Sequence, residues 1–213
     1  MKLYGVYGAS GCGRGVMPIV SSSMMEDEAA VFIDDGVSNS TVNGYPCLSW
    51  KDFLAEQAAE RSVCLAIADG AIRSKLDRKC KAAGVGFYSP KSDQTVIMDE
   101  VLIGEGAIIS PFVTFTSNIK IGRHFHANLY SYVEHDCSIG DFVTFAPGVK
   151  CNGNVVIEDH AYIGSGAILK QGKPGNPLVI GKCAVIGMGA VVTKNVPPGE
   201  TVIGNPARTL RHN

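Results

Sequence analysis

The chain has 213 residues, a formal net charge of −1, 46% hydrophobic residues and 18% charged residues. This length allows one large domain or two small ones, and the near-neutral charge argues against nucleic acid as a partner. No apolar run approaches the ~20 residues that a membrane span requires. The chain reaches glycine and serine too early for a secretory signal, so a cytoplasmic enzyme is expected.

The first 88 residues alternate strand-like and helix-like segments. In chain order they predict a strand at 2–10, a helix at 16–25, a strand at 30–35, a turn at 43–44, a helix at 49–60 capped by Ser49, a strand at 63–69 and a helix at 70–84. This alternation is typical of a small parallel α/β sheet. Glycine and proline near Gly86 and Pro90 indicate a change of architecture, so we expect domains at 1–88 and 89–213.

The second half of the chain carries a six-residue period. Stepping by six from Ile103 to Leu169 meets twelve apolar residues in succession, and all but the last are followed four residues later by another small or apolar residue. The period breaks at 170–179, which carries about five extra residues, and resumes in phase from Ile180 to Val192. Such a period is typical of a parallel β-helix, whereas an α-helix needs a period of 3.6 and a plain strand a period of two. The inserted segment is expected to form an outward loop.

The seven cysteines are scattered without a CxxC pair. An odd, unpatterned number in a chain with no export signal indicates reduced thiols, most of which should fill small apolar sites. No cluster has the ligand spacing of a zinc site, so no metal is expected.

Three stretches carry a family resemblance: GASGCG at 8–13, FIDD at 32–35 and VEHDCSIGDF at 133–142. With the hexapeptides, they resemble the sialic acid O-acetyltransferase-like family, and most closely its bacterial nucleotide-amino-sugar N-acetyltransferases of the UDP-4-amino-sugar (bacillosamine-pathway) type. The resemblance covers nearly the whole chain. It implies a small Rossmann-like nucleotide-sugar domain, followed by a left-handed parallel β-helix that forms a homotrimer and binds acetyl-CoA between subunits.

His135 is the candidate catalytic residue. Counting from Val133 places it at a corner of the β-helix, pointing away from the interior, where a neighbouring carboxylate can orient an imidazole and raise its basicity. The residues alone leave a general base and a solvated surface histidine open. The family motif of histidine followed by an acid, matched by His135 and Asp136, implies the general base, with Glu134 as a further carboxylate.

The other internal histidines are expected to be exposed or at an interface rather than catalytic. They are His124, His126 and His160.

The glycine-rich turn at 8–13 follows a predicted strand and precedes a predicted helix. Backbone N–H groups in such a turn form an anion site for phosphates, so the expected substrate-binding residues there are Gly8, Ser10, Gly11, Cys12, Gly13 and Arg14. Cys12 stands where the related transferases commonly have histidine, and Arg14 is expected to compensate.

Two further strand ends are expected to contact the nucleotide sugar. Asp34 and Asp35 end the second strand, where an acidic residue commonly contacts a ribose hydroxyl or a base N–H. Ala68 and Asp69 end the third strand and match the family's position beside the sugar and phosphates.

Coenzyme binding is expected on the later coils. Residues 150–213 carry seven Lys and Arg residues, including Lys173, against three acids, an excess that suits a coenzyme with several phosphates. By matched position, the family resemblance implies coenzyme contacts near Thr144, Ser165 and Met188.

These features predict an acetyl-CoA-dependent N-acetyltransferase acting on a nucleotide-linked amino sugar, by direct attack with His135 as base. The resemblance implies UDP rather than GDP, and a role in making sugars for surface glycans or glycoproteins. The expected apolar corners at Phe112, Tyr130 and Phe142 favour an oligomer.

Other functions fit the residues less well. O-acetylation of a sialic acid or related sugar would use the same base and fold. An oxidoreductase would need more than the three or so strands that precede the β-helix. A non-catalytic β-helix would show regular outward rows of one residue type, which are missing here.

Overall fold

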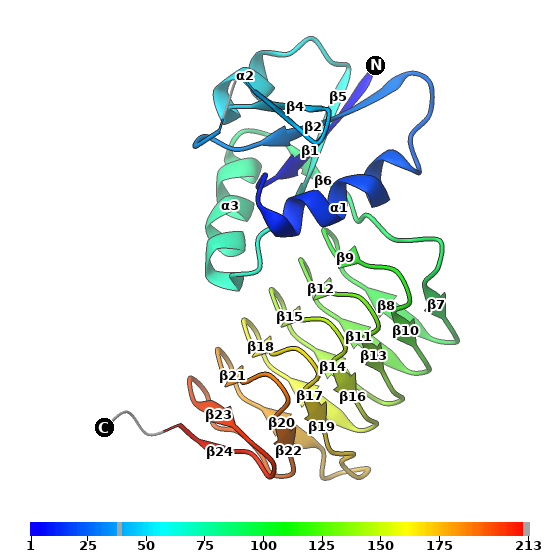
Figure 1. The fold of residues 1–213 in the computed structure, drawn as a ribbon. Helices are drawn as coiled ribbons and strands as arrows, with labels where there is room; N and C mark the ends of the chain where they lie inside the picture. The colour runs from blue at the N-terminus through cyan, green and yellow to red at the C-terminus, as the bar shows by residue number, and fades with distance from the viewer. Residues whose placement is uncertain (38–39, 211–213) are drawn as a thin grey trace.

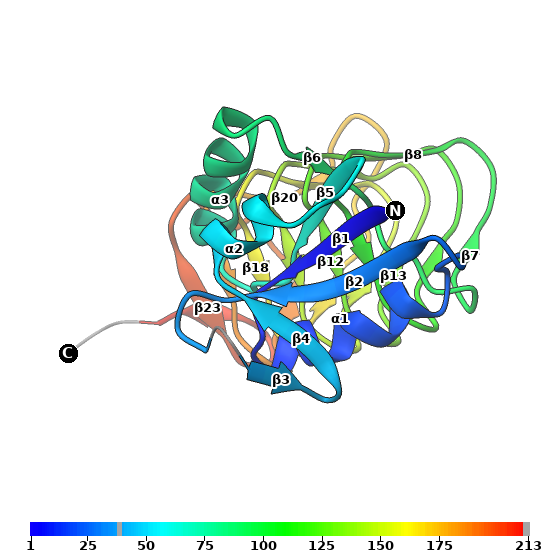
Figure 2. The same cartoon turned by 90° about the horizontal axis from the view of Figure 1, so that it is seen from above.

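The computed structural model describes residues 1–37 and 40–210. An α/β unit at the start of the chain lies above a long stack of parallel coils (Figure 1). Seen from above, its sheet and helices overlie the coils (Figure 2). No helix among the described residues is long and apolar enough to cross a membrane.

Six strands form the N-terminal sheet, in the order β3-β4-β2-β1-β5-β6. In chain order the elements are β1 Lys2–Tyr7, α1 Gly11–Ser21, β2 Glu28–Ile33, β3 Ser40–Val42, β4 Tyr45–Leu48, α2 Trp50–Ala55, β5 Glu60–Leu65, α3 Gly70–Ala82 and β6 Gly86–Phe87. All neighbouring strands are parallel except the hairpin β3–β4. Apolar side chains on one face, such as Phe32, pack with α1, and those on the other, such as Ile33, pack with α2 and α3. This two-sided burial confirms the predicted Rossmann-like α/β unit.

Two helices differ from their predicted bounds. Helix α1 begins within the glycine turn rather than at position 16 and ends at Ser21, while α2 ends at Ala55 rather than at 60. Ser49 caps α2 as predicted, because its hydroxyl accepts a hydrogen bond from the Asp52 N–H at 3.1 Å. The predicted turn at 43–44 joins β3 to β4, two short strands that the sequence analysis omitted.

Three parallel sheets form the faces of the coil stack. The β13 face contains β7 Val96–Ile97, β10 Thr114–Phe115, β13 Tyr132–Val133, β16 Lys150–Cys151, β19 Ile168–Leu169 and β22 Val191–Val192. The β14 face contains β8 Val101–Ile103, β11 Ile119–Ile121, β14 Ser138–Ile139, β17 Val155–Ile157 and β20 Leu178–Ile180. The β15 face contains β9 Ile108–Ile109, β12 His126–Ala127, β15 Thr144–Phe145, β18 Tyr162–Ile163, β21 Val185–Ile186 and β23 Thr201–Ile203, with β24 Arg208–Thr209 antiparallel to β23.

The predicted six-residue period sets this architecture. We call the apolar residues at the six-residue steps anchors. The anchors from Ile109 to Leu169 are buried in one continuous core, and Ile103 is partly buried against it. The period resumes with buried anchors from Ile180 to Val192, and the intervening loop is largely exposed. Paired strands in adjacent coils lie 18 residues apart, as Ile121 and Ile139 do. The predicted left-handed parallel β-helix is therefore confirmed.

The corner between the β14 and β15 faces differs from expectation. His124, Phe142 and His160 occupy it on successive coils with φ of 53°, 59° and 62°, a conformation that bulky residues rarely adopt. Their rings stack at centroid distances of 5.2 and 5.0 Å. Phe142, predicted to be an exposed corner, is 5% exposed because the N-terminal unit packs on it.

Candidate active site

His135 and Asp136 lie on the corner between the β13 and β14 faces. Asp136 Oδ2 is 2.7 Å from His135 Nδ1, and Asn118 of the preceding coil donates to Asp136 Oδ1 at 3.4 Å. The hydrogen bond to Asp136 raises the pKa of His135 above its ordinary value of 6.5. When Nδ1–H donates to the carboxylate, the lone pair lies on Nε2, so this nitrogen of the half-exposed ring can accept a proton.

The next coil supports the imidazole ring. A Cβ added at Gly153 would lie 2.6 Å from both Cε1 and Nε2 of His135, closer than real contacts allow. The His135 carbonyl accepts a hydrogen bond from the Asn154 N–H at 2.9 Å. Glycine at 153 therefore makes room for the ring in this position.

The glycine turn begins α1 directly. A Cβ at Gly13 would overlap the Gly8 carbonyl oxygen, and Gly8 has a φ of 105°, so both positions require glycine. The first helical hydrogen bond runs from the Arg14 N–H to the Ser10 carbonyl at 2.9 Å. The N–H groups of Gly11, Cys12 and Gly13 precede that bond and lie at the positive end of the helix dipole, an arrangement that suits a phosphate.

Cys12 and Arg14 differ in the charge that they present to a bound anion. Burial raises the pKa of the Cys12 thiol, against the opposing effect of the Arg73 charge, so Cys12 is a neutral thiol at neutral pH. Arg14 Nη1 donates to the Ala9 carbonyl at 3.4 Å, which places its guanidinium beside the turn. Arg14 therefore brings a positive charge to the edge of the turn.

The two aspartates after β2 have different contacts. Asp34 accepts hydrogen bonds from the Ala9 N–H at 3.1 Å and the Gly36 N–H at 3.0 Å, so it holds the glycine turn against β2. Asp35 accepts from the Trp50 N–H at 2.8 Å, and its other oxygen lies 3.7 Å from Lys79 Nζ.

The loop after β5 joins the N-terminal unit to the β-helix. Asp69 caps α3 by accepting hydrogen bonds from the N–H groups of Ala71 and Ile72 at 2.7 and 3.1 Å. The Ala68 carbonyl accepts from the Thr144 hydroxyl of β15 at 2.8 Å. The loop therefore touches the β-helix directly.

A cavity of about 440 Å³ lies at this junction. Its lining residues are Ala68, Asp69, Gly70 and Ala71 from the N-terminal unit and Thr144, His160, Ala161, Tyr162, Cys183 and Val185 from the β-helix. A mostly apolar cavity between two structural units, with a few polar groups, is a common form of small-ligand site.

The four residues expected to bind coenzyme do not lie together. Thr144 is buried in the junction, while Ser165 and the exposed Met188 lie on one corner, where the Ser165 carbonyl accepts from the Gly189 N–H at 2.8 Å. Lys173 lies in the exposed loop that follows β19.

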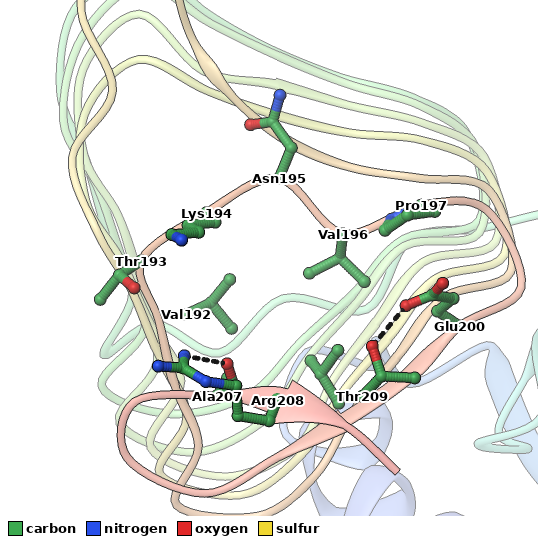
Figure 3. Close-up of a pocket in the computed structure, with 11 residues that line it drawn as sticks. Val192, Thr193, Lys194, Asn195, Val196, Pro197, Glu200, Ala207, Arg208 and Thr209 are labelled. Atoms are coloured by element: carbon green, nitrogen blue, oxygen red, sulfur yellow. Dashed lines mark hydrogen bonds between the residues drawn. The ribbon is translucent and has the colours of Figure 1, made fainter. Parts of the chain in front are cut away.

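A second hollow, of about 410 Å³, lies at the far end of the β-helix (Figure 3). Arg208 donates to the Ala207 carbonyl and Thr209 to Glu200 at its edge. None of the catalytic, substrate-binding or coenzyme-binding residues expected from the sequence lines it, so we do not assign the chemistry to it.

The residues that join the two units were not expected from the sequence. Arg73 of α3 is fully buried and donates to β15, and Asp77 of α3 lies 2.9 Å from His124 Nε2. Gly153 was not expected either, although it lies 18 residues after His135, which is one full coil of the period.

No group of three or more His, Cys, Asp or Glu side chains within 1–37 and 40–210 is arranged to hold a metal ion.

Similarity to known proteins agrees with this architecture. Residues 5–80 match the family described as the PglD N-terminal domain. The chain is 52% identical to GDP-perosamine N-acetyltransferase of Escherichia coli O157:H7, over 100% of this chain and 98% of that protein.

Two solved structures are similar over almost their whole length. WeeI from Acinetobacter baumannii AYE is 57% identical with a TM-score of 0.96, covering 99% of this chain and 100% of that one. The acetyltransferase domain of PglB from Neisseria gonorrhoeae FA1090, in complex with acetyl coenzyme A, is 25% identical with a TM-score of 0.88, covering 98% of each.

The chain therefore belongs to the hexapeptide-repeat N-acetyltransferases that act on nucleotide sugars. Within that family it is an acetyl-CoA-dependent sugar N-acetyltransferase, as its sequence motifs predicted.

Proposed function

We propose that this chain transfers the acetyl group of acetyl-CoA to the amino group of a nucleotide-linked 4-amino sugar, with His135 as general base. The observation that carries the proposal is the His135–Asp136 pair, joined at 2.7 Å on a β-helix corner where the imidazole side chain is half-exposed. The amine nitrogen attacks the thioester carbon while His135 Nε2 takes its proton. The C–N bond forms, the C–S bond breaks, and CoA leaves as the thiolate, which the proton later neutralises.

The acceptor would bind with its diphosphate at the turn 8–14, which presents unpaired helix N–H groups and the Arg14 charge. Asp35, Ala68 and Asp69 would contact the nucleotide and sugar, and Asp34 would hold the turn. We infer that residues 1–88 form this nucleotide-sugar domain and residues 89–213 the acetyltransferase domain. A cytoplasmic location would suit both the reduced thiols and the supply of acetyl-CoA.

We place the active site between subunits of a homotrimer. His135 lies on the corner between the β13 and β14 faces, whereas the N-terminal unit packs on the β15 face and its adjoining corner. No hydrogen bond or ion pair links His135 to residues 1–88 within the described part of the chain. The exposed, stacked rings of Phe112 and Tyr130, 4.9 Å apart, also favour a subunit contact. An acceptor bound to one protomer would then reach His135 of the partner subunit.

Coenzyme would lie along the groove between β-helices, near Ser165 and Met188. Lys173 would supply charge for its phosphates. We propose no coenzyme contact for Thr144, because Ala68 and Arg73 already use its hydroxyl.

The base of the nucleotide has two candidates. The motif resemblance favours a UDP-4-amino-4,6-dideoxy-N-acetyl hexosamine, and the 52% identical relative acts on GDP-perosamine. We would therefore assay both nucleotide sugars in parallel, following CoA release and the mass of the product.

An acetylated product with one of the two sugars supports the proposal and identifies the base. A product whose acetyl group is lost in mild base would instead be an ester and would favour sugar O-acetylation. No acetylation of either sugar would contradict the proposed function.

A further inference from the structure

Arg73 is a fully buried cation in the first turn of α3. Its hydrogen bonds, 2.6 to 3.2 Å long, all go to neutral oxygens: the carbonyl groups of Ile67, Ala68, Phe142 and Val143 and the hydroxyl of Thr144. Burial lowers the pKa of Arg73 to about 10, which still leaves the guanidinium charged at neutral pH. Burying a charge without an anionic partner costs free energy. We therefore look for the role of Arg73 in how it positions the backbone around it.

The guanidinium fixes a short loop against a strand. Nη1 holds the carbonyls of Ile67 and Ala68, at the end of the N-terminal sheet, while Nη2 holds those of Phe142 and Val143, beside β15. The planar fork of arginine can hold both sides at once, which the single ammonium of lysine cannot.

Two further contacts make this approach close. Thr144 bridges the pair, accepting from Arg73 Nη1 at 2.9 Å and donating to the Ala68 carbonyl at 2.8 Å. A Cβ added at Gly70 would lie 2.5 Å from the Phe142 carbonyl oxygen, so the loop lies too close to the β-helix for any side chain at this position.

The same loop forms one wall of the 440 Å³ cavity. His160, Tyr162 and Val185 of the β-helix also line it. The shape of the cavity therefore depends on how Arg73 holds the loop. The apolar side chains suit the carbon face of a deoxy sugar, and Asp69 and His160 offer polar partners for a hydroxyl or amine.

We propose that Arg73 is a positioning residue for the acceptor: by clamping residues 68–70 to β15, it sets the width of the cavity that receives the amino sugar. This inference rests on the proposed function. It requires that loss of the clamp weaken binding of the nucleotide sugar while binding of acetyl-CoA is unchanged.

Asp77 offers a matched control on the same helix. It is 5% exposed and lies at the same junction, 2.9 Å from His124 Nε2 and 3.2 Å from Arg123 Nη1. Its hydrogen bonds do not involve the loop at 67–70. Asp77→Asn therefore perturbs the docking of the two units without releasing the clamp.

The test compares steady-state kinetics of the wild type, Arg73→Lys and Asp77→Asn, with a thermal melt of each. We expect Arg73→Lys to raise KM for the nucleotide sugar about tenfold or more, since a small misplacement of a binding wall is costly. We expect KM for acetyl-CoA to stay within about twofold in Arg73→Lys, and both KM values to stay within about threefold in Asp77→Asn.

An equal rise in the Asp77→Asn variant, a rise in KM for acetyl-CoA, or no rise at all would overturn the proposal. If Arg73→Lys does not fold, Thr144→Val removes the bridging hydroxyl at nearly constant volume and should show the same selective rise in KM. If the wild type acetylates the sugar and the variants have the same KM values as the wild type, only this inference is rejected. A wild type without acetylation would reject the proposed function itself.

Discussion

The imidazole of His135 lies against Gly153, its neighbour one coil along the β-helix. The His135 carbonyl also accepts the N–H of the next residue, Asn154, at 2.9 Å. Asp136 holds the ring by Nδ1 on one side, and the bare Cα of Gly153 supports it on the other. The direction of Nε2 is therefore set by two neighbours, one electrostatic and one steric.

Gly153→Ala should displace the proposed base. The new Cβ would lie 2.6 Å from Nε2, so the ring must rotate away. We expect kcat to fall about tenfold to a hundredfold with little change in KM, because a misplacement near 1 Å is costly for proton transfer. Gly86→Ala is the control, since a Cβ there meets nothing within 4 Å. Normal kcat in Gly153→Ala would show that the ring position does not matter.

Asp136→Asn should change the pH dependence of the reaction. Asp136 raises the pKa of His135, so its removal lowers that pKa. The base is needed unprotonated, and the acid limb of kcat/KM against pH should therefore move to lower pH while the maximum rate falls about tenfold to a hundredfold. Glu134→Gln should move the limb less, because the charge of Glu134 contributes less to the pKa of His135 than Asp136 does.

Gly13→Ala should destroy the turn proposed to bind the diphosphate. Its Cβ would overlap the Gly8 carbonyl, and overpacking of this kind costs about 1–3 kcal/mol. We expect the variant to lose the thermal stabilisation that UDP or GDP gives the wild type. In the same helix, a Cβ at Gly15 meets nothing, so Gly15→Ala should keep that stabilisation and gain about 0.5–1 kcal/mol. Equal responses of the two variants to the nucleotide would contradict the assignment.

Buried histidines should make the protein sensitive to acid. Burial, and then the Arg73 charge, lowers the pKa of His126 well below 6.5, and burial also lowers the pKa of His124. Both histidines are neutral in the folded protein and take up protons on unfolding. Their contribution to the free energy of unfolding is therefore complete above pH 6.5 and is lost as the pH falls below it. The free energy of unfolding, from urea melts at pH 7.5 and 5.5, should fall less in His126→Gln than in the wild type.

The β-helix could be predicted from the sequence because the residues that repeat every six positions are the ones buried in its interior. Each anchor from Ile109 to Leu169 is apolar for one local reason, which is that it fills the interior of its own coil. The start of α1 at Gly11 could not be predicted, because glycines have low helix propensity and no apolar pattern marks them. The proposed base was found from a local pair, His135 and Asp136.

The junction between the two units gives no such local signal. Arg73 and Thr144 are 71 residues apart and meet only because α3 packs on β15. The same holds for Asp77 and His124, 47 residues apart. Charge on an amphipathic helix predicts solvent exposure, and only the tertiary structure shows that these two side chains are buried.

The role of His135 as general base is tested most directly by comparing the wild type with His135→Ala. CoA release would be followed at saturating acetyl-CoA and nucleotide-linked 4-amino sugar, using whichever of the UDP and GDP sugars the wild type acetylates. We predict a fall in kcat of about 10²–10⁴, the usual contribution of a general base, with both KM values nearly unchanged. A variant that acetylates the sugar at close to the wild-type rate would contradict the mechanism.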